Sequence, residues 1–383
     1  MRCLRCGNED HTYFYFDQNS HTWYCRKCVG FKRLDVGQYP EQKQYQKRRI
    51  DCDYQLEYPL TLKQEKAVNE IMQYLRQKKD VLVYAACGAG KTELTMEAIK
   101  WYLREGKKVG FAISRRQVVL EIKDRMTKAF PQLQVVAVCE GYTSVVDGDL
   151  IICTMHQLYR YPHTFDLLIM DEVDAFPYRD NLLLESIAYL SCCGQKLMLT
   201  ATPDEKVLQQ VKDQKLSMVT LFQRPHGFPL IVPKVIRLPK SLQLLYAIQY
   251  LKKQRKRNIQ TLVFVPTIVM AKQLYKCLKW LFACTVFTSQ TMNKEEIIKE
   301  FHQKKYEFLI STTVLERGIT IKGIYVLILS GDHAVFHEAS LIQMIGRVGR
   351  SIEMPKGEGI ILCSKKTKAI KRCKEALEEM NKE

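Results

Sequence analysis

Short apolar runs alternate with amphipathic segments from about residue 59 onward. The runs VLVYA (81–85) and VGFAI (109–113) are rich in strand-forming residues, and a segment with helical periodicity follows each of them. Such alternation is typical of a parallel sheet that helices cover on both faces. Further strands are predicted at 135–138, 150–154, 167–172 and 196–202. We therefore expect a first α/β lobe over residues 59–232.

The same pattern restarts after Pro225, Pro229 and Pro233. Apolar runs, again separated by helical segments, lie at 261–266, 284–288, 308–313, 325–330 and 359–364. These runs predict a second parallel-sheet lobe over residues 233–383. A length of 383 residues suits two domains of about 150 residues plus a small appendage.

The appendage, residues 1–58, begins with two cysteine pairs. Cys3 and Cys6 form one C-x-x-C motif, Cys25 and Cys28 form a second, and eighteen residues separate the two. This spacing predicts a structural zinc site of four thiolates, and two disulfides are the alternative. The aromatic residues between the pairs are expected to form a small core, with one or two exposed for base stacking or a protein partner; they are Tyr13, Phe14, Tyr15, Phe16, Trp23 and Tyr24.

Residues 31–58 are basic and polar and show no clear periodicity, which predicts a linker or a loosely packed connector. The two basic clusters further along the chain, KKQRKR (252–257) and KKTKAIKRCK (365–374), are interpreted either as solvated helix faces or as binding patches.

The overall charge and the cysteine pattern restrict the partners and the compartment. Fifty-nine basic against 41 acidic residues give a net charge of +18, which favours a polyanionic partner, although a merely soluble basic surface is the alternative. Most cysteines, such as Cys153 and Cys277, lie singly in apolar runs and are interpreted as reduced core thiols of a cytosol-like compartment. Because no run reaches the ~20 apolar residues of a membrane span, any membrane association is expected to be peripheral.

The segment AACGAGKTE has the composition of a phosphate-binding loop between a strand and a helix. Glycines at 88 and 90 allow successive backbone N–H groups to turn toward phosphate oxygens. Lys91 supplies a positive charge to the β and γ phosphates, and Thr92 offers a hydroxyl to Mg²⁺. The first glycine of the usual motif is replaced by Ala85. The residues expected to bind the nucleotide here are Gly88, Ala89, Gly90, Lys91, Thr92 and Glu93.

Adjacent carboxylates follow the predicted strand in LLIMDEVD. Asp171 is expected to hold Mg²⁺, and Glu172 to polarise the attacking water as a general base. Asp174 is expected to bridge neighbouring elements rather than to contact the nucleotide.

Two arginines lie close together in QMIGRVGR (343–350). Gln343, Arg347 and Arg350 are predicted to lie on a helix and its C-terminal turn. The guanidinium group is always charged and has a fixed geometry, so it suits the charge that develops on a transferred γ-phosphate. If these arginines face the phosphate loop across a cleft, hydrolysis requires closure of the two lobes; arginines on a solvated helix are the alternative.

Together, GAGKT, DEVD, TAT (200–202) and QxxGRxGR resemble the motifs of superfamily 2 helicases and translocases, over about residues 59–365 and closer to the DExH branch. More narrowly, CGAGKTE, DEVDAFP and the four-cysteine module resemble the ComFA competence family of Gram-positive bacteria. The resemblance implies two RecA-like lobes in tandem behind a small zinc module. It also implies a cytosolic ATPase that uses ATP, Mg²⁺ and structural Zn²⁺ and takes up transforming DNA.

The resemblance also assigns roles to individual residues. Gln64 would read the adenine, and Thr200 and Thr202 would couple hydrolysis to lobe movement. Contacts with the sugar-phosphate backbone of a single DNA strand would come from Arg115, Arg116, Thr154, His156, Thr267, Thr312 and Thr313. For His156 a packed histidine is the alternative, and the role of Glu316 stays open. The partners implied are single-stranded DNA, ComFC and the DNA-uptake channel at the inner face of the membrane.

Three functions are therefore compared. The first is a translocase of single-stranded DNA that drives uptake into competent cells, and the second is a replication-restart or DNA-repair helicase. The third is a nucleic-acid-binding scaffold without catalysis, which the complete set of catalytic residues disfavours.

Overall fold

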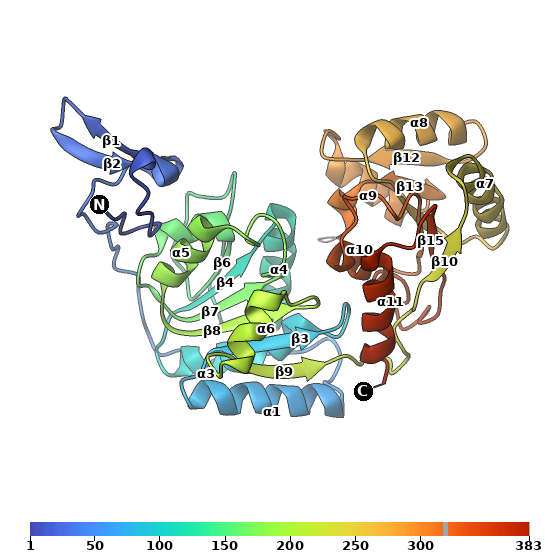
Figure 1. Ribbon diagram of the computed structural model, residues 1–383. Helices are drawn as coiled ribbons and strands as arrows, with labels where there is room; N and C mark the ends of the chain where they lie inside the picture. The colour runs from blue at the N-terminus through green and yellow to red at the C-terminus, as the bar shows by residue number, and fades with distance from the viewer. Residues whose placement is uncertain (317–320, 383) are drawn as a thin grey trace. The chain divides into compact units, whose positions relative to one another are not determined.

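The computed structural model describes residues 1–316 and 321–382 (Figure 1). The chain divides into two compact units. The first comprises residues 1–85 and 90–221, and the second comprises residues 222–383 together with the short segment 86–89. Each unit contains one parallel sheet, and the two are RecA-like lobes, as expected from the sequence.

Seven parallel strands form the sheet of the first unit, in the order β5-β6-β4-β7-β8-β3-β9. The strands are β3 (Val81–Ala85), β4 (Val109–Ile113), β5 (Val135–Val138), β6 (Leu150–Thr154), β7 (Phe165–Asp171), β8 (Cys192–Thr200) and β9 (Ser217–Leu221). The helices are α1 (Leu62–Arg76), α2 (Lys91–Leu94), α3 (Met96–Arg104), α4 (Arg116–Ala129), η3 (Met155–Arg160), α5 (Leu182–Ser191) and α6 (Glu205–Lys212).

Helices cover this sheet on both faces, because its central strands are apolar on both sides. In Figure 1, α1 and α3 lie below the sheet and α5 lies above it. A buried cluster beneath α5 and η3 joins Ile187 and Leu158 to strand residues such as Ile151 and Leu168. The carboxyl ends of β3, β4, β6 and β7 are thereby fixed along one edge of a rigid sheet.

Six parallel strands form the sheet of the second unit, in the order β10-β15-β14-β11-β13-β12. The strands are β10 (Lys234–Arg237), β11 (Thr261–Phe264), β12 (Cys284–Phe287), β13 (Phe308–Ser311), β14 (Tyr325–Ile328) and β15 (Gly359–Cys363). The helices are α7 (Lys240–Lys256), α8 (Ile268–Leu278), α9 (Lys294–His302), η4 (Thr313–Leu315), α10 (Glu338–Ile345) and α11 (Lys368–Met380).

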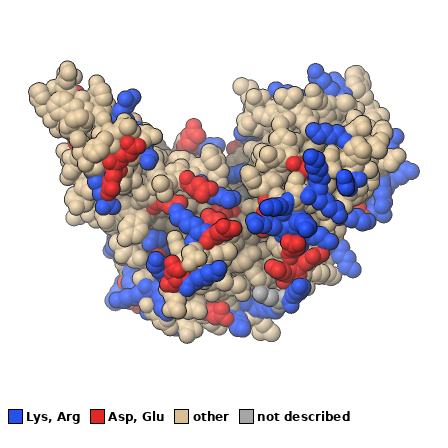
Figure 2. Space-filling view, viewed as in Figure 1, with Lys and Arg blue, Asp and Glu red and all other residues tan. Residues whose placement is uncertain are grey.

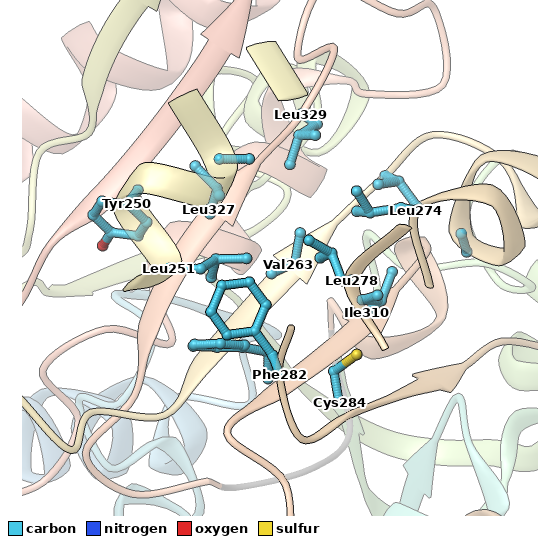
Figure 3. Packing of buried hydrophobic residues seen from close by; sticks show 14 of the residues in the cluster. Tyr250, Leu251, Val263, Leu274, Leu278, Phe282, Cys284, Ile310, Leu327 and Leu329 are labelled. Atoms are coloured by element: carbon cyan, nitrogen blue, oxygen red, sulfur yellow. The ribbon is translucent and has the colours of Figure 1, made fainter. Parts of the chain in front are cut away.

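The second sheet has its own core, in which α7 and α8 pack against the strands (Figure 3). Leu251 of α7 and Leu278 of α8 are completely buried there with Val263 and Leu327 of the neighbouring strands β11 and β14. Since this cluster is formed within the unit, the second lobe has the apolar interior of a domain.

The N-terminal module is a two-stranded antiparallel hairpin, β1 (Phe14–Asp17) and β2 (Thr22–Cys25), between the 3₁₀ helices η1 (His11–Tyr13) and η2 (Arg26–Phe31). The expectation that the aromatic residues of this module form a small core was wrong for most of them. Only Phe14 packs with the four cysteines and Leu34, whereas Tyr13, Tyr15, Phe16 and Trp23 are exposed. Strand alternation explains the difference, because only one face of the hairpin meets the cysteines and the strands extend beyond them.

The connector after this module lacks regular secondary structure, but it is not loosely packed. Arg48 donates two hydrogen bonds to the Asp149 carboxylate, each of 3.0 Å. The Tyr45 hydroxyl donates to the carbonyl oxygen of Arg160 at 2.9 Å, and the Ile50 amide donates to a carbonyl oxygen of α3 at 3.1 Å. The sequence showed no periodicity here because these partners lie on distant elements of the first lobe.

Two smaller observations concern the cysteines and membrane spans. Cys153 is buried, as expected, but Cys277 is exposed on α8, so its interpretation as a core thiol was wrong. Within the described residues, no helix has both the length and the apolar character that crossing a bilayer requires.

Candidate functional site

The phosphate loop joins the end of β3 to the start of α2. Gly88 and Gly90 have φ angles of 83° and 87°, a left-handed conformation that favours glycine. The Lys91 ammonium donates to the carbonyl oxygen of Ala85 at 3.3 Å, which places it against the loop. Thr92 is buried in the same helical turn, and the Glu93 carboxylate forms an ion pair with Arg125 on α4.

Gln64 lies beside this loop. Its side-chain oxygen accepts a hydrogen bond of 2.9 Å from the Thr61 amide, which completes a capping box at the start of α1. Only 3% of the residue is exposed. A Cβ atom on Gly90 would approach the Gln64 amide nitrogen to 2.5 Å, so the two residues are in close contact, and the φ of 87° favours glycine at position 90. Adenine recognition by Gln64 stays a prediction.

The acidic pair follows β7, two strands away from β3 in the sheet. The Asp171 carboxylate accepts a hydrogen bond of 2.9 Å from the Glu172 amide. Burial raises the pKa of Asp171 to about 7, and the neighbouring charge of Glu172 adds to this rise, whereas the Lys91 charge opposes it. Burial and Glu172 thus disfavour the ionised form of Asp171, and a nearby positive charge such as that of Lys91 favours it.

Asp174 links the acidic segment after β7 to the end of β8, where TAT (200–202) begins. Its carboxylate accepts a hydrogen bond of 2.5 Å from the Thr200 hydroxyl and a second bond from the Thr202 hydroxyl. Thr200 and Asp174 are both buried. This geometry confirms that Asp174 bridges neighbouring elements, and it connects β7 mechanically to the end of β8.

The residues expected to contact a nucleic-acid backbone on the first lobe follow adjacent strands, β4 and β6. Arg115 and Arg116 begin α4, and the Arg116 side chain donates to the carbonyl oxygen of Glu140 at 2.9 Å. Thr154 ends β6. The His156 ring is exposed and stacks on Phe31 of the N-terminal module, with ring centroids 6.2 Å apart. This ring contact is compatible with the packing alternative, and contact of His156 with nucleic acid stays a prediction.

On the second lobe the corresponding residues also follow adjacent strands, β11 and β13. The Thr267 hydroxyl caps α8 by accepting a hydrogen bond of 3.1 Å from the Met270 amide. Thr312 is buried before η4, and Thr313 begins it. Each lobe thus places its predicted backbone contacts at one edge of its own sheet.

The arginine motif lies on α10 and the turn after it, as its sequence predicted. Gln343 is buried on α10, and its side-chain oxygen accepts a hydrogen bond of 3.1 Å from the Cys87 thiol of the 86–89 segment, within the second unit. Arg347 is buried, whereas Arg350 is partly exposed and donates to the carbonyl oxygen of Gly346 at 2.9 Å.

One buried arginine next to this motif, Arg224, was missed by sequence reasoning. It lies in a proline-rich segment with no periodicity, and nothing in its neighbours along the chain indicated burial.

The four N-terminal cysteines converge on one point. Their sulfur atoms all lie within 4.8 Å of one another, and the Cys3–Cys28 and Cys6–Cys25 sulfur distances are both 3.6 Å. Tetrahedral zinc with bonds of about 2.3 Å requires edges of about 3.8 Å, whereas a disulfide requires about 2.05 Å. The donor set therefore fits zinc. Arg5 braces the module by donating to the carbonyl oxygens of Cys28 and Lys32.

Comparison with family models identifies two helicase segments. The model described as "Type III restriction enzyme, res subunit" matches residues 57–205, and the model described as "Helicase conserved C-terminal domain" matches residues 240–352.

Two curated proteins are similar over almost the whole chain. The competence protein ComFA of Streptococcus pneumoniae is 32% identical, over 100% of this chain and 90% of its own length. The competence protein ComFA of Bacillus subtilis is 29% identical, over 99% of this chain and 85% of its own length.

Among solved structures, the Mycobacterium smegmatis helicase Lhr bound to ssDNA and AMP-PNP is similar in fold. The TM-score is 0.62 at 16% identity, over 82% of this chain and 48% of that one. At this identity the likeness concerns the fold alone.

Proposed function

This chain belongs to the ComFA family of superfamily 2 helicases, and from that membership we propose that it moves single-stranded DNA during DNA uptake by competent cells. It is an ATPase of the helicase type. The observation that supports the finer proposal is the extent of the similarity. The aligned region spans 99% to 100% of this chain, so it includes the N-terminal cysteine module as well as both lobes.

The phosphate loop is proposed to bind the triphosphate of ATP. Backbone N–H groups between Gly88 and Thr92 would hold the phosphate oxygens, and the Lys91 ammonium would neutralise the β and γ phosphates. Thr92 and Asp171 are the proposed ligands of Mg²⁺, which would neutralise phosphate charge when bound. Glu172, whose backbone has φ of 54°, is the proposed base that orients the attacking water.

On the second lobe, Gln343, Arg347 and Arg350 are proposed to serve hydrolysis. Charge develops on the γ-phosphate during transfer, and a guanidinium group stabilises it without any change of protonation. Thr200 and Thr202, held by Asp174, are proposed to transmit the state of the nucleotide to the rest of the first lobe.

The nucleic-acid contacts are proposed for threonine and arginine side chains rather than for base-reading groups. Thr154, Thr267, Thr312 and Arg115 lie after the carboxyl ends of strands, where hydroxyl and guanidinium groups can bind phosphates. Such contacts carry no sequence information, which suits a translocating enzyme.

Family membership also supports proposals on the compartment and the partners of the protein. We place the protein in the cytoplasm, peripherally at the inner face of the membrane, with ComFC and the DNA-uptake channel as partners. Zinc is proposed to hold the N-terminal module together and to take no part in hydrolysis.

The first experiment measures ATP hydrolysis by the purified protein alone and with single-stranded DNA, duplex DNA or single-stranded RNA. Strong stimulation by single-stranded DNA, abolished in Lys91→Ala, is expected. Equal or stronger stimulation by RNA would contradict the DNA-uptake proposal.

A second experiment separates uptake from replication restart or repair. Deletion of the gene is expected to abolish transformation and to leave survival of DNA damage unchanged. The opposite pattern would favour the repair helicase.

A further inference from the structure

The turn after α10 leaves several carbonyl groups in need of donors. A helix ends with carbonyl oxygens that have no partner within the helix, and a partial negative charge accumulates there. Here the chain continues through Gly346 and Gly349, and Gly349 has φ of 69°. A Cβ atom on Gly349 would lie 2.4 Å from the carbonyl oxygen of Pro355, so the turn is tightly enclosed and cannot relax toward solvent.

Arg224 supplies donors to these carbonyls. Its Nη1 donates to the carbonyl oxygens of Val348 and Gly349, each at 2.7 Å, and its Nη2 donates to that of Gly346 at 2.8 Å. The remaining donor, Nε, binds the carbonyl oxygen of Cys87 at 2.9 Å, within the same unit. Only 1% of the Arg224 surface is exposed.

His226 supports the same turn from two residues further along. Its Nε2 lies 2.9 Å from the carbonyl oxygen of Gly349, which Arg224 also contacts. The chain entering the second lobe therefore holds the turn through two side chains.

Among the described residues, the hydrogen bonds of Arg224 all go to carbonyl oxygens and none to a carboxylate. Burial and the neighbouring Arg350 charge lower the pKa of Arg224 to about 10. Burying a cation is costly, so the hydrogen bonds to the carbonyl oxygens must offset the desolvation of the guanidinium group. A planar group with several fixed donors is, however, what three diverging carbonyls require.

We propose that Arg224 is a positioning residue for ATP hydrolysis, which fixes the 346–349 turn and through it the side chains of Arg347 and Arg350. This inference rests on the proposed role of those two arginines. A reacting group displaced by about 1 Å can lose about 100-fold in rate, so a residue that sets the turn affects catalysis without touching the nucleotide.

The test compares Arg224→Lys with a matched control. Lysine keeps the charge, but its single nitrogen cannot take the places of Nε, Nη1 and Nη2, which bind four separate carbonyl oxygens. Arg237→Lys, the control, removes a guanidinium that binds one carbonyl oxygen, that of Ser364, at 3.1 Å on the surface of the same lobe. In the presence of single-stranded DNA, Arg224→Lys is expected to lower kcat by about 10- to 100-fold. KM for ATP and the affinity for DNA are expected to change little, and Arg237→Lys is expected to behave as wild type.

If Arg224 only stabilises the fold, Arg224→Lys is expected to have a different effect. In that case Arg224→Lys lowers the melting temperature or the native fraction, and kcat per native molecule is unchanged, which would overturn the inference. If Arg224→Lys does not fold, His226→Ala provides the milder variant. It removes one of the bonds to Gly349, and a several-fold lower kcat with unchanged KM is expected; an unchanged kcat would count against the inference.

The double variant distinguishes failure of the inference from failure of the proposed function. If Arg224 acts through Arg347 and Arg350, then Arg224→Lys lowers kcat by a smaller factor in an Arg350→Ala background than in the wild type. Losses that multiply would show that Arg224 acts independently of Arg350. If Arg347→Ala and Arg350→Ala themselves leave hydrolysis intact, the proposed role of the arginine motif is wrong, and the inference on Arg224 is wrong with it.

Discussion

At the level of single residues, buried hydrogen bonds hold the Asp174 carboxylate. Its two donors are the hydroxyl groups of Thr200, the last residue of β8, and of Thr202 just after it. A buried carboxylate that loses a donor has no water to replace it. The contacts of Thr200 are therefore expected to contribute both to stability and to coupling.

Thr200→Val tests this contact. The substitution keeps the shape of the side chain and removes the donor, so the free energy of unfolding is expected to fall by about 1.5–3 kcal/mol. Thr220→Val, at an exposed position on β9, is the control and is expected to change stability little. Urea unfolding of the full chain measures both. Equal effects of the two substitutions would show that the Thr200 hydroxyl does not stabilise the lobe.

At the scale of elements, two segments outside the lobes acquire structure from contacts that no periodicity reveals. The four clustered cysteines hold the hairpin of the N-terminal module together. Phe31, at the end of η2, packs against His156 and Tyr159 of η3. Small modules with few core residues usually need a metal or a disulfide. The connector instead depends on hydrogen bonds to the loop around Asp149.

Measurement of the zinc content tests the metal site of the N-terminal module. The purified protein is expected to carry one zinc per chain, and Cys25→Ser is expected to lose it, because three thiolates leave the tetrahedral site incomplete. Cys193→Ser, at an exposed cysteine outside the cluster, is expected to retain the metal. Hydrolysis of ATP is expected to persist in Cys25→Ser. A folded wild-type protein with almost no zinc would refute the metal site.

Limited proteolysis tests whether Arg48 holds the connector against the first lobe. Arg48→Ala removes both bonds to Asp149, so the connector is expected to detach locally and chymotrypsin to cut faster after Tyr45. Lys43→Ala, at an exposed position in the same connector, is the control and is expected to leave the rate unchanged. An unchanged cleavage rate in Arg48→Ala would mean that other contacts suffice to hold the segment.

For the molecule as a whole, basic residues outnumber acidic ones. Basic residues (blue) are spread over both units in Figure 2, in line with the net charge of +18. The cluster at 252–257 lies at the end of α7, where Lys253, Arg255 and Lys256 are exposed to solvent. This exposure is that of a solvated helix face, and a binding role for the cluster stays a prediction.

Salt dependence tests how much of the binding is electrostatic. For single-stranded DNA, the logarithm of the binding constant is expected to fall linearly with the logarithm of salt concentration, with a slope of about −0.7 for each phosphate neutralised. Oligonucleotides of equal length and different sequence are expected to give the same slope. A binding constant that is independent of salt would contradict a phosphate-dominated interface.

Most strands of the two parallel sheets could be predicted from the amino-acid sequence. Eleven strands of the two lobes were predicted from apolar runs, because buried parallel strands must be apolar on both faces. The strands it missed, β9 and β10, lie at the edges of their sheets, where a strand needs less apolar surface and the sequence signal is weak. The phosphate loop and the cysteine pairs were also visible, because their chemistry depends on residues that are close in the chain.

Features whose partners are distant in sequence became visible only in the folded chain. The docking of the connector, the exposure of the hairpin aromatics and the stacking of His156 on Phe31 all depend on which surfaces meet after folding. Arg224 is the clearest case, since its side chain binds carbonyl groups more than 120 residues away. Backbone carbonyls are identical in every residue, so a contact made to them leaves no pattern in the sequence.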